Sequence, residues 1–140
     1  MISCYELRIG NYVLVEKDIK KVSKINSTTI STVDAEKYTT QPGSEHGLEN
    51  IQPVLLTDDV LKQCGFIYHE YFKFWQLMTT GIRSEMDLNS DYDVIDFARR
   101  PIFKNLRSLH ELQNIYFMLK GRELAFPLAQ LLTDNYAITV

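Results

Sequence analysis

The sequence predicts an α+β fold that combines two antiparallel sheet regions with one main C-terminal helix. Short runs of β-branched and aromatic residues, separated by turn residues, fill residues 12–33 and recur over residues 66–103. An apolar stripe at helical spacing follows over residues 109–119. The chain has 140 residues, 45% of them hydrophobic and 24% charged, so it can bury a core and has the composition of an ordinary globular protein.

The N-terminal segment, residues 1–33, is expected to form an SH3-like meander of three antiparallel strands. Tyr12 to Val15 is a short apolar run, and Lys17-Asp18 is expected to make the tight turn that follows it. Ile19 to Ile25 alternates, and Thr28 to Val33 is a third, β-branched run. Tight connections between three consecutive short strands favour a meander.

The whole chain is expected to be a single domain, residues 1–140. Residues 34–50 contain glycine, proline and many polar residues, and are predicted to be a long exposed loop. An α+β body is expected over residues 51–124, and a C-terminal extension over residues 125–140. Within this extension a short helix and a terminal strand are predicted, at residues 127–132 and 136–140.

Two helices are predicted in the body. Thr57 is a favourable N-cap for the shorter one, because a hydroxyl can accept a free N–H of the first turn, and Gly65 is a favourable end. The longer helix starts after Ser108, which has the spacing of a capping box with Glu111, and ends at Gly121. Its apolar stripe consists of Leu109, Leu112, Tyr116 and Leu119.

A second antiparallel sheet region is predicted between the two helices. Phe66 to Met78 is an aromatic, β-prone run, Tyr92 to Ala98 alternates, and Ile102-Phe103 follows a proline. The polar residues from Ser84 to Ser90 are expected to be turn material. Core packing, rather than stacking on nucleic-acid bases, is expected of the rings of Phe72, Phe74 and Trp75.

Charge and cysteine content exclude several classes of protein. The net charge is −3, from 15 Lys and Arg residues against 18 Asp and Glu residues, which disfavours a dedicated nucleic-acid-binding domain. Cys4 and Cys64 form no CxxC pair, so neither a disulfide framework nor a cysteine zinc site is expected. No apolar run could span a membrane, and no basic and apolar leader is visible. A cytoplasmic location, no membrane partner and no cofactor are expected.

Two segments imitate known chemical motifs. His110 to Asn114 departs from the H-E-x-x-H zinc motif, because Asn114 stands where the second imidazole is needed. Asp87 to Asp93 resembles the start of a calcium loop, but Tyr92 occupies its glycine position and Ala98 its glutamate position. The chain also has no G-x-S-x-G elbow, Walker loop or G-x-G-x-x-G fingerprint. We expect a non-enzymatic protein without catalytic, cofactor-binding or metal-ligating residues.

Charged residues are clustered along the sequence. An acidic stretch at residues 85–96 is followed by a basic strip at residues 99–107, and a second basic strip lies at residues 17–24. The favoured interpretation is solvated faces joined by short-range ion pairs. The other is a basic face that contacts phosphate, with aromatic residues nearby for stacking. The candidate residues of the later strip are Arg99, Arg100, Lys104 and Arg107.

Three motifs follow one another along the chain. The first is Leu7 to Val13, the second runs from Pro53 to Phe66, and the third from Leu109 to Leu124. In this order they resemble a widespread family of small uncharacterised proteins from gut bacteria of the Bacteroides group, their phages and their mobile elements. The resemblance covers most of residues 7–124. It implies no catalytic residue, because no biochemical function is established for the family.

The third motif also contains two amide side chains. Gln113 and Asn114 are expected beside the apolar stripe, where their amides could bond either strand edges or a partner. The leading functional prediction is a non-enzymatic interaction module, encoded by a phage or mobile element, that binds a protein partner. The alternative is a nucleic-acid-binding accessory protein that uses the basic strips at residues 17–24 and 99–107. The identity of the partner and the oligomeric state stay open.

Overall fold

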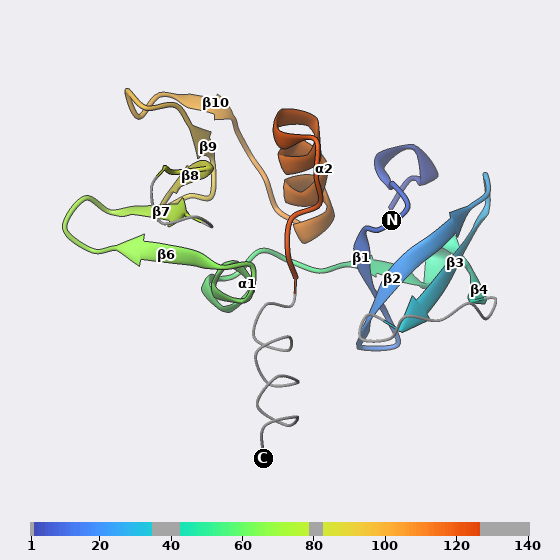
Figure 1. Ribbon diagram of the computed structural model, residues 1–140. Helices are drawn as coiled ribbons and strands as arrows, with labels where there is room; N and C mark the ends of the chain where they lie inside the picture. The colour runs from blue at the N-terminus through green and yellow to red at the C-terminus, as the bar shows by residue number, and fades with distance from the viewer. Residues whose placement is uncertain (1, 35–42, 79–82, 127–140) are drawn as a thin grey trace, which may run out of the picture. The chain divides into compact units, whose positions relative to one another are not determined.

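The computed structural model describes residues 2–34, 43–78 and 83–126 (Figure 1). The chain divides into two compact units, and each is built on a five-stranded antiparallel sheet. The long helix α2 (Leu109–Lys120) belongs to the first unit. The predicted α+β fold, with two antiparallel sheets and one main helix toward the C-terminus, is therefore confirmed. That residues 1–140 form a single domain stays a prediction.

The first unit joins Met1–Leu55 to Ser108–Glu123, so α2 folds with strands far from it in sequence. Its strand order is β4-β3-β2-β1-β5. The strands are β1 (Tyr12–Val15), β2 (Asp18–Ile25), β3 (Thr29–Asp34), β4 (Ser44–Gly47) and β5 (Ile51–Pro53). Two 3-10 helices complete it, η1 (Cys4–Glu6) and η2 (Leu48–Asn50). Consecutive pairing of β1, β2 and β3 is the predicted meander, while its likeness to an SH3 barrel stays a prediction.

The turn between β1 and β2 lies one residue earlier than predicted. Val15 pairs with Asp18, so the turn residues are Glu16 and Lys17 rather than Lys17-Asp18. Both have positive φ, +51° and +73°, which gives the twist that a two-residue hairpin needs. Such a turn normally contains Asn or Gly, and the absence of either here explains the displaced prediction.

A β-bulge in β2 changes which of its residues face the core. Val22 pairs with Thr32 and Lys24 with Ser31, so β2 has one extra residue at this point. The extra residue places both Val22 and Ile25 against the same core, although strict alternation would put them on opposite faces. The core of this sheet also includes Val13, Val15, Ile30 and Ile51.

The prediction of an exposed loop over residues 34–50 is corrected in its second half. Ser44–Gly47 form β4, which pairs with β3 from Thr32 to Thr29, and η2 follows directly. The strand was missed because its residues are polar and half-exposed, as suits a sheet edge, so it has no apolar periodicity. Residues 35–42 lie outside the described residues.

Helix α2 packs against β1 through part of its predicted stripe. Leu109, Leu112 and Tyr116 are buried, but Leu119 is 48% exposed, so the buried stripe ends at Tyr116. The end at Gly121 is confirmed, with φ +71° and its N–H donating to Phe117 O. The capping box is corrected, because Ser108 Oγ accepts no backbone N–H and donates to Glu111 Oε1 at 2.7 Å instead.

The second unit joins Leu56–Arg107 to Leu124–Val140. Its strand order is β10-β9-β8-β7-β6. Its elements are α1 (Asp58–Gln63), β6 (Phe66–His69), β7 (Phe74–Leu77), β8 (Met86–Asn89), β9 (Val94–Ile95) and β10 (Pro101–Phe103). The first helix is confirmed, since Thr57 Oγ1 accepts the Val60 N–H at 3.2 Å.

Two sequence predictions for this sheet are wrong in detail. Ser84 to Ser90 is not only turn, because Met86 and Leu88 point into the core from strand β8 while polar residues alternate with them. The run from Tyr92 to Ala98 contributes only the two residues of β9. The helix and strand predicted at 127–132 and 136–140 lie outside the described residues. Within the described ranges, no helix is long and apolar enough to cross a membrane.

Replacing Leu112 tests the packing of α2. Its side chain is fully buried, so Leu112→Ala should lower the free energy of unfolding by ~2–5 kcal/mol, through lost burial and the cavity left behind. Leu119→Ala, on the exposed part of the same helix, should change it by less than ~0.5 kcal/mol. Urea denaturation measures both. Equal losses in the two variants would contradict this orientation of α2.

Candidate functional site

The first motif of the sequence forms a tight turn that leads into β1. Asn11 is fully buried. Its side-chain Oδ1 accepts the backbone N–H of Arg8 at 2.7 Å, and its backbone N–H donates to Arg8 O at 3.0 Å. Gly10 has φ +100° and donates its N–H to Val22 O on β2. A side chain at Gly10 would be strained in this left-handed conformation. The turn therefore depends on both Gly10 and Asn11.

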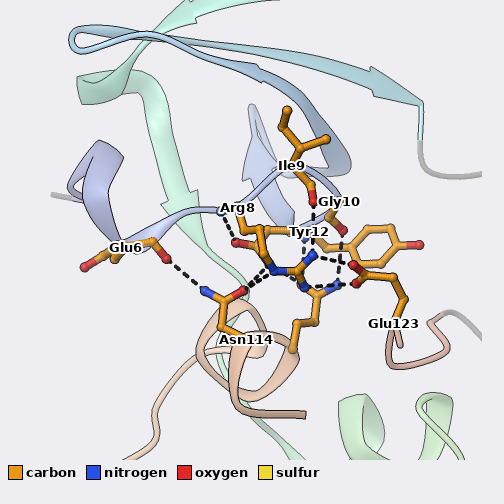
Figure 2. Close-up of polar contacts among 9 residues, drawn as sticks. Glu6, Arg8, Ile9, Gly10, Tyr12, Asn114 and Glu123 are labelled. Carbon is orange, nitrogen blue, oxygen red and sulfur yellow. Dashed lines mark hydrogen bonds and ion pairs between the residues drawn. The ribbon is translucent and has the colours of Figure 1, made fainter. Parts of the chain in front are cut away.

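The third motif supplies the amides that hold this turn (Figure 2). Gln113 Oε1 accepts the Tyr12 N–H at 2.9 Å, and Gln113 Nε2 donates to Gly10 O at 3.2 Å. Asn114 Oδ1 accepts from Asn11 Nδ2 at 2.8 Å, and Asn114 Nδ2 donates to Glu6 O at 3.0 Å. We call these contacts of Asn11, Gln113 and Asn114 the amide clasp.

Arg8 covers the clasp on its outer side. Its Nε donates to Asn114 Oδ1 at 3.2 Å, and its two terminal nitrogens pair with the carboxylate of Glu123. The guanidinium carbon also lies 4.2 Å from the centre of the Phe117 ring, as in a cation–π contact. Residues from the two ends of the described chain thus meet in one polar cluster, as Figure 2 shows.

The clasp answers one question that the sequence leaves open. Of the two uses predicted for Gln113 and Asn114, bonding to a strand is observed, because Gln113 binds the first residue of β1. Gln113 is almost fully buried, and the amides of both residues bond within the first unit. Their position therefore supports a structural role, and their use in recognising a partner stays a prediction.

His110 lies close to possible catalytic partners without forming a relay with them. Glu6 Oε1 and Ser108 Oγ are 3.4 and 3.5 Å away, but both face the same ring nitrogen, Nε2. A serine relay needs the acid and the hydroxyl on opposite ring nitrogens. The other nitrogen, Nδ1, is buried and has no hydrogen-bond partner among the described residues. Burial lowers the pKa of His110, and the charges of Glu6 and Glu111 oppose this shift.

The segment that imitates a calcium loop consists of the last three residues of β8 and the hairpin turn that follows them. Asn89 Oδ1 accepts the N–H groups of Asp91 and Asp93, and Asp93 Oδ1 accepts the Asn105 N–H at 3.0 Å. These bonds shape the turn. In the part of the chain that the structure describes, no three His, Cys, Asp or Glu side chains gather as a metal-ligand set.

Cys64 is buried, and this burial raises its pKa to about 12, so it is a protonated thiol in the core.

The two basic strips are partly neutralised by neighbouring groups. In the 99–107 strip, Arg100 Nε lies 3.1 Å from Asp96 Oδ2, and the pKa of Asp96 is lowered chiefly by the Arg100 backbone N–H. In the 17–24 strip, Lys20 Nζ lies 2.6 Å from Asp34 Oδ1. Lys104 and Arg107 are exposed in the second unit. These ion pairs support the interpretation of the strips as solvated faces.

Arg99 has a different role, because it ties together two turns of the second unit. Its Nη1 donates to Phe72 O at 3.1 Å, and its guanidinium carbon lies 5.0 and 5.1 Å from the ring centres of Phe72 and Phe74. The turn between β6 and β7 thereby meets the turn between β9 and β10. Arg99 has φ +64°, which is uncommon for a residue with a side chain.

These two turns also present exposed aromatic rings. Tyr71 is 88% exposed, Phe72 55% and Phe97 96%. We call these three rings with the Arg99 guanidinium the aromatic surface. The prediction that Phe72 packs in the core is wrong, while Trp75 is buried as predicted. Turn conformation breaks the alternation at Lys73, whose φ is +56°, so alternation could not place Phe72.

A groove lies in the same unit between α1 and β6. It has a volume of about 610 Å³, and its lining includes Asp58, Lys62, Phe66, Tyr68, Glu70 and Trp75. The rings of Tyr68 and Trp75 lie 5.0 Å apart, and Tyr68 Oη is 3.2 Å from Ser90 Oγ. Tyr92 Oη donates to Asp58 Oδ1 at 2.6 Å, and burial together with this bond raises the pKa of Tyr92 to about 12.

Comparison of the chain with models of protein families, with curated proteins and with solved structures finds no match. The resemblance to the Bacteroides-group family therefore stays a prediction.

Replacing Gln113 tests the amide clasp. Gln113→Leu keeps the approximate volume but leaves the buried Tyr12 N–H and the half-buried Gly10 O without the Gln113 amide, at a cost of roughly 1–3 kcal/mol for the buried N–H. Glu123→Gln, at the exposed rim, should cost less than ~1 kcal/mol. Urea denaturation compares the two. A Gln113→Leu variant as stable as the wild type would exclude a structural role for these bonds.

Burial of His110 predicts a pH dependence of stability. Because its pKa in the folded chain is below the ordinary 6.5, the unfolded chain takes up the proton first as the pH falls. The contribution of the neutral imidazole is complete above pH ~6.5 and is lost between that pH and the lowered pKa. Denaturation at about pH 7.5 and 5.5 should show wild type losing more stability than His110→Gln. Equal losses would mean that His110 titrates normally.

Proposed function

We propose that the chain is a non-enzymatic interaction module that binds a protein partner through the aromatic surface of its second unit. A phage or mobile-element origin is part of the proposal, and only the family resemblance supports it. The cytoplasmic location expected from the sequence is also part of the proposal.

One observation carries the proposal: three aromatic rings project from two turns that Arg99 fastens together. Tyr71 and Phe97 are almost fully exposed, although burying such rings is strongly favourable. Tyrosine, phenylalanine and arginine are also the residue types enriched at the centres of protein interfaces. The contacts of Arg99 with Phe72, and the edge-to-face packing of Tyr71 on Phe72, hold these two rings in place before binding, which reduces the entropic cost of association.

The charges around this surface favour a protein over a nucleic acid. The Arg99 guanidinium already binds a backbone carbonyl, and Arg100 is paired with Asp96. A phosphate would have to compete with these contacts. The chain as a whole has a net charge of −3, which slows encounter with a polyanion. An uncharged or mixed-charge protein surface meets neither obstacle.

Capture of partners from a host-cell extract tests the proposal. The paired change Tyr71→Ser and Phe97→Ser should abolish capture of the partner, and nuclease treatment should leave wild-type capture unchanged. Tyr5→Ser is the matched control, because Tyr5 is an equally exposed ring in the first unit. The captured protein is then purified, and its affinity for each variant is measured. The affinity should be at least about tenfold lower for the paired variant and unchanged for Tyr5→Ser. Equal affinities would contradict the proposal.

Nucleic-acid binding is measured separately. Binding that depends on phosphate falls steeply with salt, because counterions are released. We expect no micromolar affinity for single-stranded or duplex DNA or RNA at ~0.15 M salt. Micromolar affinity that is lost when Arg99, Arg100, Lys104 and Arg107 are changed together to Gln would contradict the protein partner. It would support the alternative predicted from the sequence, a nucleic-acid-binding accessory protein.

A further inference from the structure

Strand β6 is the outermost strand of the second sheet (Figure 1). It pairs with β7 on one side, from Phe66–Leu77 to His69–Phe74, and the described residues place no strand on its other side. On that side every second residue of an edge strand directs its N–H and C=O away from the sheet. A free edge of this kind is a template for one more strand.

The groove described above includes residues of this edge strand in its lining. Phe66 and Tyr68 in this lining come from β6, and Asp58 and Lys62 come from α1. The latter two are four residues apart in α1, so they lie on the same face of the helix. A groove between an edge strand and a helix is the arrangement in which extended peptides bind by strand addition.

The two aromatic rings in the lining of the groove suit one apolar side chain. Tyr68 is half-buried and its ring leans on that of buried Trp75, with the planes tilted by 57°. The bond from Tyr68 Oη to Ser90 Oγ anchors the far end of the tyrosine ring. In an added strand, alternate side chains point to the same face, so one would lie over these rings while its neighbours point away.

The charges of the groove indicate what flanks this apolar side chain. Asp58 and Glu70 contribute two carboxylates to the lining, and Lys62 contributes one ammonium. The excess of negative charge favours a lysine or arginine in the bound segment and disfavours a nucleic acid. A helical segment would leave the edge N–H and C=O groups of β6 without hydrogen bonds, because a helix satisfies its own backbone.

We propose that the edge of β6 binds an extended peptide segment of a protein partner as a sixth strand, with an aliphatic or aromatic side chain over Tyr68 and Trp75 and a basic side chain near Asp58 and Glu70. This inference rests on the proposed binding function, for which it names the form of the partner. The groove residues are not those of the aromatic surface, so the two can be tested with separate variants.

Selection from a phage-displayed library of random twelve-residue peptides on the full chain provides the probe. We expect enriched peptides to alternate apolar and polar residues and to carry a lysine or arginine. The best one is then synthesised with backbone N-methyl groups on alternate residues, in either of two registers. Because an added strand uses only every second N–H, one register should weaken binding at least about tenfold and the other should leave it nearly unchanged.

Variants of the chain test the charged wall. Asp58→Asn with Glu70→Gln should weaken the selected peptide at least about tenfold, whereas Asp59→Asn should not, since Asp59 does not line the groove. The absence of enriched peptides, or equal effects of both N-methyl registers, would overturn strand addition. Self-association abolished by Ile67→Lys, without peptide binding, would assign the edge to a second copy and also overturn it. In either case, capture that depends on Tyr71 and Phe97 would leave the binding function standing.

Discussion

The side-chain amide of Gln113 is the constraint on which the first unit depends. It bridges Tyr12 N–H and Gly10 O, and so joins the start of the sheet to a helix more than a hundred residues away in sequence. The bond to the Tyr12 N–H is buried and the bond to Gly10 O is half-buried, so the loss of Gln113 would be costly chiefly at Tyr12. Asn11 and Asn114 extend the same network, and Arg8 closes it toward solvent.

The two units differ in how their polar and aromatic side chains are used, and this difference bears on function. The first and third motifs, which carry the family resemblance, are used mainly to hold the first unit together, so their polar residues are bound internally. The second unit has the opposite character: Tyr71 and Phe97 are exposed, β6 has a strand on only one side among the described residues, and β6 contributes to the lining of a groove. We therefore propose that the second unit, with its exposed aromatic rings and its edge strand, binds the partner. The motif residues of the first unit have a structural role.

Local signals in the sequence predicted most of the fold. Thr57 and Gly121 mark helix ends through their own chemistry, and β1 is an uninterrupted apolar run, so all three are confirmed. Features that depend on distant residues were missed. Strand β4 is polar and is defined by its pairing with β3, and the bulge in β2 reverses the simple alternation. The site was also found only in part: Arg99 was singled out for its charge, whereas its stacking on Phe72 depends on two turns that no periodicity connects.

Amide hydrogen exchange at Tyr12 tests the central role of the clasp most directly. The Tyr12 N–H donates to a buried side-chain oxygen, so in wild type it should exchange as slowly as the neighbouring Val22 N–H, which donates to Asn11 O. In Gln113→Ala the Tyr12 amide should lose its protection, while amides inside the β2–β3 pairing keep theirs. Fast exchange of Tyr12 in the wild-type protein, or unchanged protection in the variant, would contradict the account.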